Sequence, residues 1–95
     1  VSHLHGDHYG GIPYIFLEYL FENRRERPLT LVGPPTVLER SMSLYACLYR
    51  ELQHHELPFR IDLVEMSPGS RATVAGFEVE AFRVQHNAEP FALGY

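Results

Sequence analysis

Near its start the sequence contains the stretch His3-Leu4-His5-Gly6-Asp7-His8, which places four metal-ligating side chains within six residues. Imidazole nitrogens together with a carboxylate oxygen are ligands that Zn²⁺ favours, and they also accept Fe or Mn. An isolated histidine is usually a solvated surface residue, whereas a cluster as dense as this one indicates a metal site.

The residues on either side place this cluster on a loop between a strand and a helix. Val1 and Ser2 have the character of a strand end, and Gly10 and Gly11 come just before an amphipathic run. Connecting loops carry a disproportionate share of catalytic groups. We interpret Gly6 as the residue that allows the backbone to turn, because it has no Cβ to restrict φ.

The spacing of the ligands suggests two metal ions. His3 and His5 lie two residues apart, so in an extended chain they point the same way and can bind one ion. Asp7 and His8 belong to the entry of the helix and can face a second ion. A catalytic zinc has three protein ligands and an open position, and His86, at the end of a predicted strand, is the best candidate for the third ligand.

The HxHxDH pattern of residues 3–8 resembles the signature of the metallo-β-lactamase superfamily. The flanking residues look like the branch that contains ribonuclease Z, the tRNA 3′-processing endonuclease. The flanks that carry this resemblance are Val1-Ser2, Tyr9-Gly10-Gly11-Ile12-Pro13, Val84-Gln85-His86 and Ala92-Leu93-Gly94-Tyr95.

The resemblance implies two divalent metal ions, most readily Zn²⁺ with Fe or Mn as alternatives. His3, His5 and His86 would hold one ion, and Asp7 and His8 the other. It also implies a bridging aspartate and a last histidine beyond residue 95, and several strands before residue 1. We therefore expect an α/β fold that is about one half of an αββα sandwich, with residues 1–95 forming an incomplete domain.

Composition agrees with a packed globular chain, since 45% of the 95 residues are hydrophobic and 13% are aromatic. The single cysteine, Cys47, excludes an internal disulfide, lies in a helical pattern and is expected in the core. Its presence as a lone thiol favours a cytoplasmic location. No apolar run reaches the roughly 18 residues of a membrane span, so we expect no membrane partner.

The net charge of −4 argues against a nucleic-acid surface, although two bound divalent ions would attract phosphate locally. All basic residues are arginines, and Arg24, Arg25 and Arg27 cluster after the first predicted helix. Cations there complement the helix dipole, and we favour this role over the alternative, a patch that binds substrate phosphate.

Hydrophobic periodicity predicts two helices. The first spans residues 8–23, and the second begins after Thr36, a predicted N-cap paired with Glu39 as a capping box, and ends near residue 53. Ile12, Ile15, Phe16, Tyr19 and Leu20 form the first apolar stripe, and Leu38, Met42, Tyr45, Tyr49 and Leu52 form the second. His54 and His55 follow and are expected at the surface.

Strands are predicted at residues 29–32, 59–66, 71–74, 77–85 and 91–95. Ala75-Gly76 is expected to connect the third and fourth of these as a hairpin. In the fourth strand Phe82 and Val84 share a face with His86, where we expect them to wall the site.

These observations favour metal-dependent hydrolysis of a phosphodiester, with RNA, including precursor tRNA, as a possible substrate. Asp7 is the candidate catalytic residue because its carboxylate could orient or deprotonate the attacking water. Two alternatives stay open: a hydrolase of the same superfamily that acts on a lactone, thioester or β-lactam carbonyl, and a non-catalytic scaffold.

Residues 1–95 alone are expected to be inactive. Half of a sandwich would also expose an apolar sheet face and unpaired edges, so self-association, including a homodimer, is expected.

Overall fold

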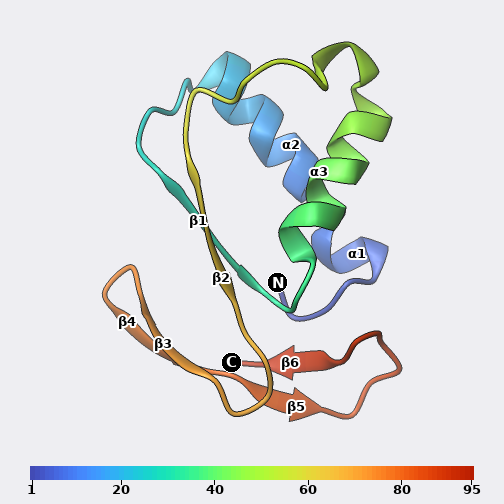
Figure 1. The fold of residues 1–95 in the computed structure, drawn as a ribbon, viewed down its shortest axis with the longest axis vertical. Coiled ribbons are helices and arrows are strands. Elements are labelled where there is room, and N and C mark those ends of the chain that lie inside the picture. The colour runs from blue at the N-terminus through green and yellow to red at the C-terminus, as the bar shows by residue number, and fades with distance from the viewer.

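A computed structural model describes residues 1–95 and places the helices on one side of a parallel strand pair (Figure 1). The helical elements are α1 (Gly6–Tyr9), α2 (Ile12–Leu17), the π-helical turn η1 (Glu18–Glu22), α3 (Val37–Leu48) and the 3₁₀ turn η2 (Arg50–Leu52). The strands are β1 (Leu29–Gly33), β2 (Ile61–Glu65), β3 (Arg71–Val74), β4 (Phe77–Glu80), β5 (Phe82–Val84) and β6 (Ala92–Gly94). The shortest dimension is 17 Å, which leaves room for one helix layer of about 10–12 Å on a sheet.

β1 and β2 run parallel, and α3 forms the crossover between them (Figure 1). Parallel neighbours need a connection of this kind, because their ends lie at opposite edges of the sheet. The register pairs Leu29 with Ile61 and Gly33 with Glu65. The strand predicted at residues 29–32 is confirmed, although none of these four residues is buried as predicted. The strand predicted within 59–66 is confirmed as well.

The predicted hairpin is also confirmed, since β3 and β4 pair antiparallel around Ala75 and Gly76. Both turn residues have positive φ, 49° and 83°, which is the backbone of a type I′ turn. The single strand predicted over 77–85 is wrong, because the chain changes partners at Ala81. β4 pairs with β3, whereas β5 pairs antiparallel with β6.

The first residues of the chain join two of these sheets. The Val1 amine donates to the carbonyl oxygen of Val32 at 2.7 Å, and the Leu93 amide donates to the carbonyl oxygen of Ser2 at 2.9 Å. Residues 1–2 therefore lie between β1 and β6, bonded to both as a strand would be. They are not part of a regular strand. The prediction that residues 1–2 end a strand is therefore correct about their place beside the sheet and wrong about their secondary structure.

The long first helix predicted over 8–23 is wrong in extent, because it is divided into α1, α2 and η1 at residues 10–11 and again after Leu17. Its apolar stripe is only partly right. Ile12 and Phe16 are buried, but Ile15 is 44% exposed. A π-helical turn holds more residues per turn than an α-helix, so a stripe drawn at α-helical spacing does not continue through it.

The predicted capping box of the second helix is wrong. Thr36 has φ of 70° and makes no capping hydrogen bond with its side chain. Its backbone N–H instead donates to the carboxylate of Glu65 at 2.9 Å. This contact is made to a residue at the end of β2, so no local pattern in the sequence indicates it.

The face that α3 buries is shifted from the predicted one. Val37 and Tyr45 are buried together with Ser41, whose hydroxyl donates to the carbonyl oxygen of Val37 at 2.7 Å. Met42, predicted in the stripe, is 38% exposed. Cys47 is exposed as well, so its predicted place in the core is wrong.

Two separate hydrophobic clusters form the core. The first lies between the helices and the β1–β2 pair, and the second lies where β2 and the β5–β6 pair meet. Leu4, Ile12, Phe16, Val37, Tyr45 and Phe59 make up the first cluster, and Met66, Ala81 and Leu93 make up the second.

Only 15 of 95 residues are buried, and large apolar side chains such as Phe77 remain 72% exposed. The exposed apolar surface expected of a thin layer is therefore present. The architecture is a small α+β arrangement, which is compatible with the expected α/β class. The half-sandwich itself, and the incomplete domain that it implies, stay predictions.

Candidate metal centre

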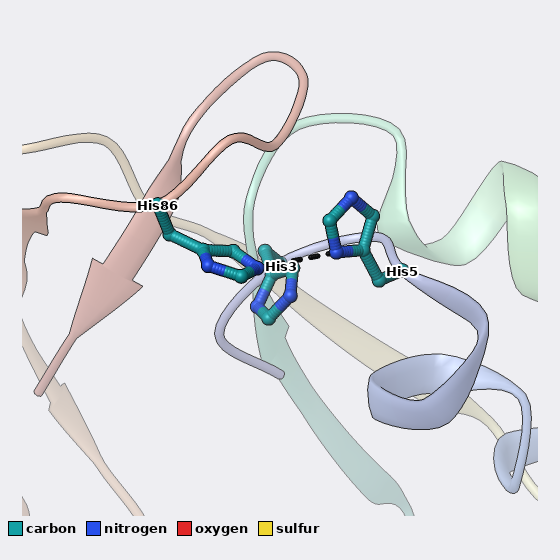
Figure 2. Close-up of side chains that lie close together, drawn as sticks. All are labelled: His3, His5 and His86. Atoms are coloured by element: carbon teal, nitrogen blue, oxygen red, sulfur yellow. Dashed lines mark hydrogen bonds between the residues drawn. The ribbon is translucent and has the colours of Figure 1, made fainter.

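Three histidines from the two ends of the chain meet at one point (Figure 2). His3 and His5 precede α1, and His86 follows β5. Each offers one ring nitrogen, and the three nitrogens lie within 4.8 Å of one another. His86 Nε2 and His5 Nδ1 are 3.2 Å apart although 81 residues separate them in sequence. The structure thus brings together the three residues that the sequence predicted for one ion.

Backbone and core contacts hold these side chains in place. Leu4 is buried in the first hydrophobic cluster, so the histidines before and after it are turned toward the other side of the chain. The hydrogen bond from Leu93 to Ser2 attaches the segment that carries His3 to β6, whose partner β5 leads into His86. The two parts of the cluster are therefore directly connected through the sheet.

His3 is the buried member of the cluster, with 5% of its surface exposed. Its Nδ1 lies 2.9 Å from the hydroxyl of Ser2, and its Nε2 is buried without a hydrogen-bond partner. A buried polar atom without a partner costs free energy. An imidazole nitrogen left free in this way has the chemistry of a metal ligand, so the residues present fit a divalent ion.

The surroundings of His3 also favour its neutral form. Burial lowers the pKa of His3, and the neighbouring His8, His86 and His5 lower this pKa further, with only Asp7 opposing them. Neutral imidazole is the form that binds a metal.

Asp7 and His8, predicted to hold a second ion, lie beside this cluster on α1. The ring of His8 is 3.9 Å from that of His3, and His8 Nε2 is 3.6 Å from the Asp7 carboxylate. The Asp7 side chain is 81% exposed. No third ligand joins this pair within residues 1–95, so its role as a second site stays a prediction.

Ser2 is a residue of the site that the sequence analysis missed. Its Oγ lies 2.9 Å from Nδ1 of His3 and 3.3 Å from Nδ1 of His8. The only indication in the sequence is that a serine directly precedes the first histidine. Its contact with His8 depends on the fold, which turns His8 back toward Ser2.

The glycine that this loop requires is Gly10, and the interpretation of Gly6 is wrong. Gly6 does not have a positive φ, and a Cβ placed on it would meet nothing within 4 Å. A Cβ on Gly10 would lie 2.3 Å from the backbone oxygen of Gly6. The close approach that closes α1 therefore excludes any side chain at residue 10.

Other predicted features lie outside the cluster. His54 and His55 are exposed, as expected. Phe82 and Val84 are 53% and 36% exposed, and their role in walling the site stays a prediction.

Arg24, Arg25 and Arg27 surround an open hollow after η1. The Arg25 side chain donates to the carbonyl oxygens of Arg27 and Pro28, and its guanidinium lies 5.0 Å from the ring centre of Tyr19. Arg25 therefore stabilises the loop to which it belongs through contacts within that loop and with η1.

Comparison with known proteins places the chain in a family. Residues 1–94 match the family model of the anti-Pycsar protein Apyc1. The chain belongs to the Apyc1 family. Individual relatives are also similar over nearly the whole chain. The chain is 33% identical over 95 residues to ribonuclease Z of Methanosarcina mazei, and 29% identical over 91 residues to ribonuclease Z of Staphylococcus aureus.

This Apyc1-family chain spans about a quarter of the length of those relatives, 28% in both cases. The similarity supports a relationship with ribonuclease Z. No solved structure matches the chain significantly. None of its helices combines the length and the apolar character that crossing a bilayer demands.

Proposed function

We propose that this chain carries the metal-binding part of a phosphodiester hydrolase that resembles ribonuclease Z and has the metallo-β-lactamase fold. The observation that carries the proposal is the convergence of His3, His5 and His86, whose nitrogens lie within 4.8 Å of one another. The ribonuclease Z relatives support a nuclease over a hydrolase of carbonyl compounds.

The donor set suits a divalent ion such as Zn²⁺. The three imidazoles, from one buried and two exposed histidines, would give such an ion the three protein ligands that a catalytic zinc has. Fe and Mn accept the same ligands. Asp7 and His8 would hold a second ion together with ligands from the rest of the protein, which would complete the αββα sandwich around the site.

Divalent ions bound there would supply the positive charge that activates water and polarises a phosphoryl oxygen. The chain itself contributes the surroundings. Burial of His3 keeps its imidazole neutral and excludes water from one side of the cluster. Besides holding the second ion, the exposed carboxylate of Asp7 would orient the attacking water and accept its proton.

The proposal can be tested on the full protein that contains these residues. The measurements are its content of bound metal and its cleavage of bis(p-nitrophenyl) phosphate and of precursor tRNA. We expect the pair His3→Ala and His5→Ala to lose bound metal and to reduce turnover at least a hundredfold. His54→Ala and His55→Ala provide the matched control, because they remove two exposed histidines away from the cluster, and should change neither. Equal activity of the two double variants would contradict the site, and cleavage of neither substrate by the metal-loaded protein would exclude a phosphodiesterase.

A further inference from the structure

The Ser2 hydroxyl is shared between two histidines that belong to different predicted metal sites. Its Oγ lies within hydrogen-bonding distance of Nδ1 of His3 and of Nδ1 of His8. His3 was assigned to one ion and His8 to the other. The rings of the two histidines lie 3.9 Å apart, so one oxygen reaches both.

Hydrogen-bond chemistry restricts what this arrangement allows. A serine hydroxyl has two acceptor lone pairs and one proton, and a neutral imidazole has one N–H donor and one free nitrogen. If both Nδ1 atoms carry the proton and donate to Ser2, both Nε2 atoms keep free lone pairs. In His3 that nitrogen has no hydrogen-bond partner, and in His8 it lies 3.6 Å from the Asp7 carboxylate without a hydrogen bond to it, so neither Nε2 is engaged as a donor.

The serine is itself held in place by the sheet. Its carbonyl oxygen accepts the Leu93 amide of β6, and the carbonyl oxygen of the preceding residue accepts the Tyr95 hydroxyl at 2.8 Å. A hydroxyl fixed to the β5–β6 pair is therefore placed by the same element that delivers His86.

We propose that Ser2 is a positioning residue that accepts Nδ1–H from both His3 and His8 and so directs Nε2 of each toward its metal ion. This role rests on the proposed metal-dependent function for its purpose, whereas the two contacts themselves involve protein atoms only. Removal of a hydrogen-bond partner that fixes the tautomer of a histidine ligand commonly changes metal affinity by about 10- to 100-fold.

The tautomers are measurable in the metal-free full protein by long-range ¹H–¹⁵N correlation spectra of ¹⁵N-histidine-labelled samples, assigned with single-histidine variants. We expect His3 and His8 to carry the proton on Nδ1 in the wild type. Ser2→Ala should shift both toward the Nε2–H form that free histidine favours, and should weaken Zn²⁺ binding at least tenfold in competition with a chromogenic chelator. Ser2→Thr keeps the hydroxyl and should restore both readouts.

Ser43→Ala is the matched control, because it removes an exposed serine hydroxyl on α3 and should leave tautomers and affinity unchanged. Unaltered tautomers in Ser2→Ala, or an Nε2–H form of either histidine in the wild type, would overturn the proposal. A wild type that binds no Zn²⁺ would refute the proposed function alone, because the tautomer spectra still decide whether Ser2 positions the two rings.

Discussion

At the scale of single residues, His3 combines burial with a titratable ring, which makes stability depend on pH. The unfolded chain titrates this histidine near its ordinary pKa of 6.5, whereas burial lowers the pKa in the folded protein. As pH falls through about 6.5, the unfolded state takes up the proton first. The folded state is therefore fully favoured above that pH and loses stability below it.

We expect the unfolding free energy of the metal-free protein to fall between about pH 7 and pH 5, by at most about 1.4 kcal/mol per pH unit for one proton. Urea unfolding at a series of pH values measures this slope. His3→Asn should flatten it, whereas His54→Asn, which removes an exposed histidine, should leave it as in the wild type. The same slope in both variants would show that His3 is not its source.

Site residues could be predicted where the evidence for them is local in the sequence, and not where it depends on contacts between distant or turned segments. His3 and His5 could be paired from their spacing, and His86 from its place after a strand, because each rests on local periodicity. Ser2 could not be predicted, since its contact with His8 depends on how α1 turns. Gly10 was missed for the same reason, because its requirement comes from the Gly6 carbonyl rather than from its own φ.

At the scale of elements, α1 depends on Gly10, and this gives a matched pair of substitutions. In Gly10→Ala the new Cβ would lie 2.3 Å from the backbone oxygen of Gly6, whereas in Gly11→Ala nothing lies within 4 Å. We expect the first change to cost about 1–3 kcal/mol of unfolding free energy and the second less than about 1 kcal/mol.

Because α1 carries Asp7 and His8, Gly10→Ala should also disturb the site. Denaturant unfolding and Zn²⁺ titration of both variants test these expectations together. Similar stability and Zn²⁺ affinity of the two alanine variants would show that α1 accommodates a side chain at residue 10 with no loss of free energy. That result would contradict the steric requirement for Gly10.

The β3–β4 hairpin holds a strained residue, because Ala75 has φ of 49°. A left-handed conformation costs an ordinary L-residue about 1–2 kcal/mol, and asparagine before glycine is the sequence that type I′ turns favour. Ala75→Asn should therefore stabilise the protein by about 1 kcal/mol. Ala75→Val, with a branched side chain, should have the opposite effect, and a thermal unfolding series in which both variants move the same way would refute the turn assignment.

Strands and turns were predicted better than helix faces, and the reason is physical. Alternation and the Ala75-Gly76 pair are local signals, so β1, β2, β3 and the hairpin were found. The face of α3 is chosen by what it packs on, which moved the buried positions to Val37, Ser41 and Tyr45. The αL conformation of Thr36 likewise depends on Glu65, a contact across 29 residues.

At the scale of the whole molecule, the histidine cluster lies at the junction of the two hydrophobic clusters. Leu4 anchors the His3 and His5 segment in the first cluster. Leu93 and Ala81, on either side of β5 in sequence, belong to the second cluster together with Met66. The geometry of the histidine cluster therefore depends on both hydrophobic clusters and on the hydrogen bond between Ser2 and Leu93 that joins them.

The two methionines of the chain allow this dependence to be tested. Met66 is 1% exposed at the centre of the second cluster, whereas Met42 is 38% exposed on α3. Met66→Ala should lower the unfolding free energy by about 2–5 kcal/mol, the usual cost of a large-to-small change in a core. Met42→Ala should cost less than about 1 kcal/mol, because little buried contact is lost.

The two methionine variants also test whether the second hydrophobic cluster holds His86 in place while the first holds His3 and His5. A loosened second cluster releases the β5–β6 side of the site while the first cluster still holds Leu4, so the cluster should lose one of its three histidines. Under conditions where Met66→Ala remains folded, we expect its Zn²⁺ dissociation constant to rise at least tenfold and that of Met42→Ala to stay unchanged. Weakening of Zn²⁺ binding to the same degree in both variants, or in neither, would show that His86 is placed independently of the second cluster.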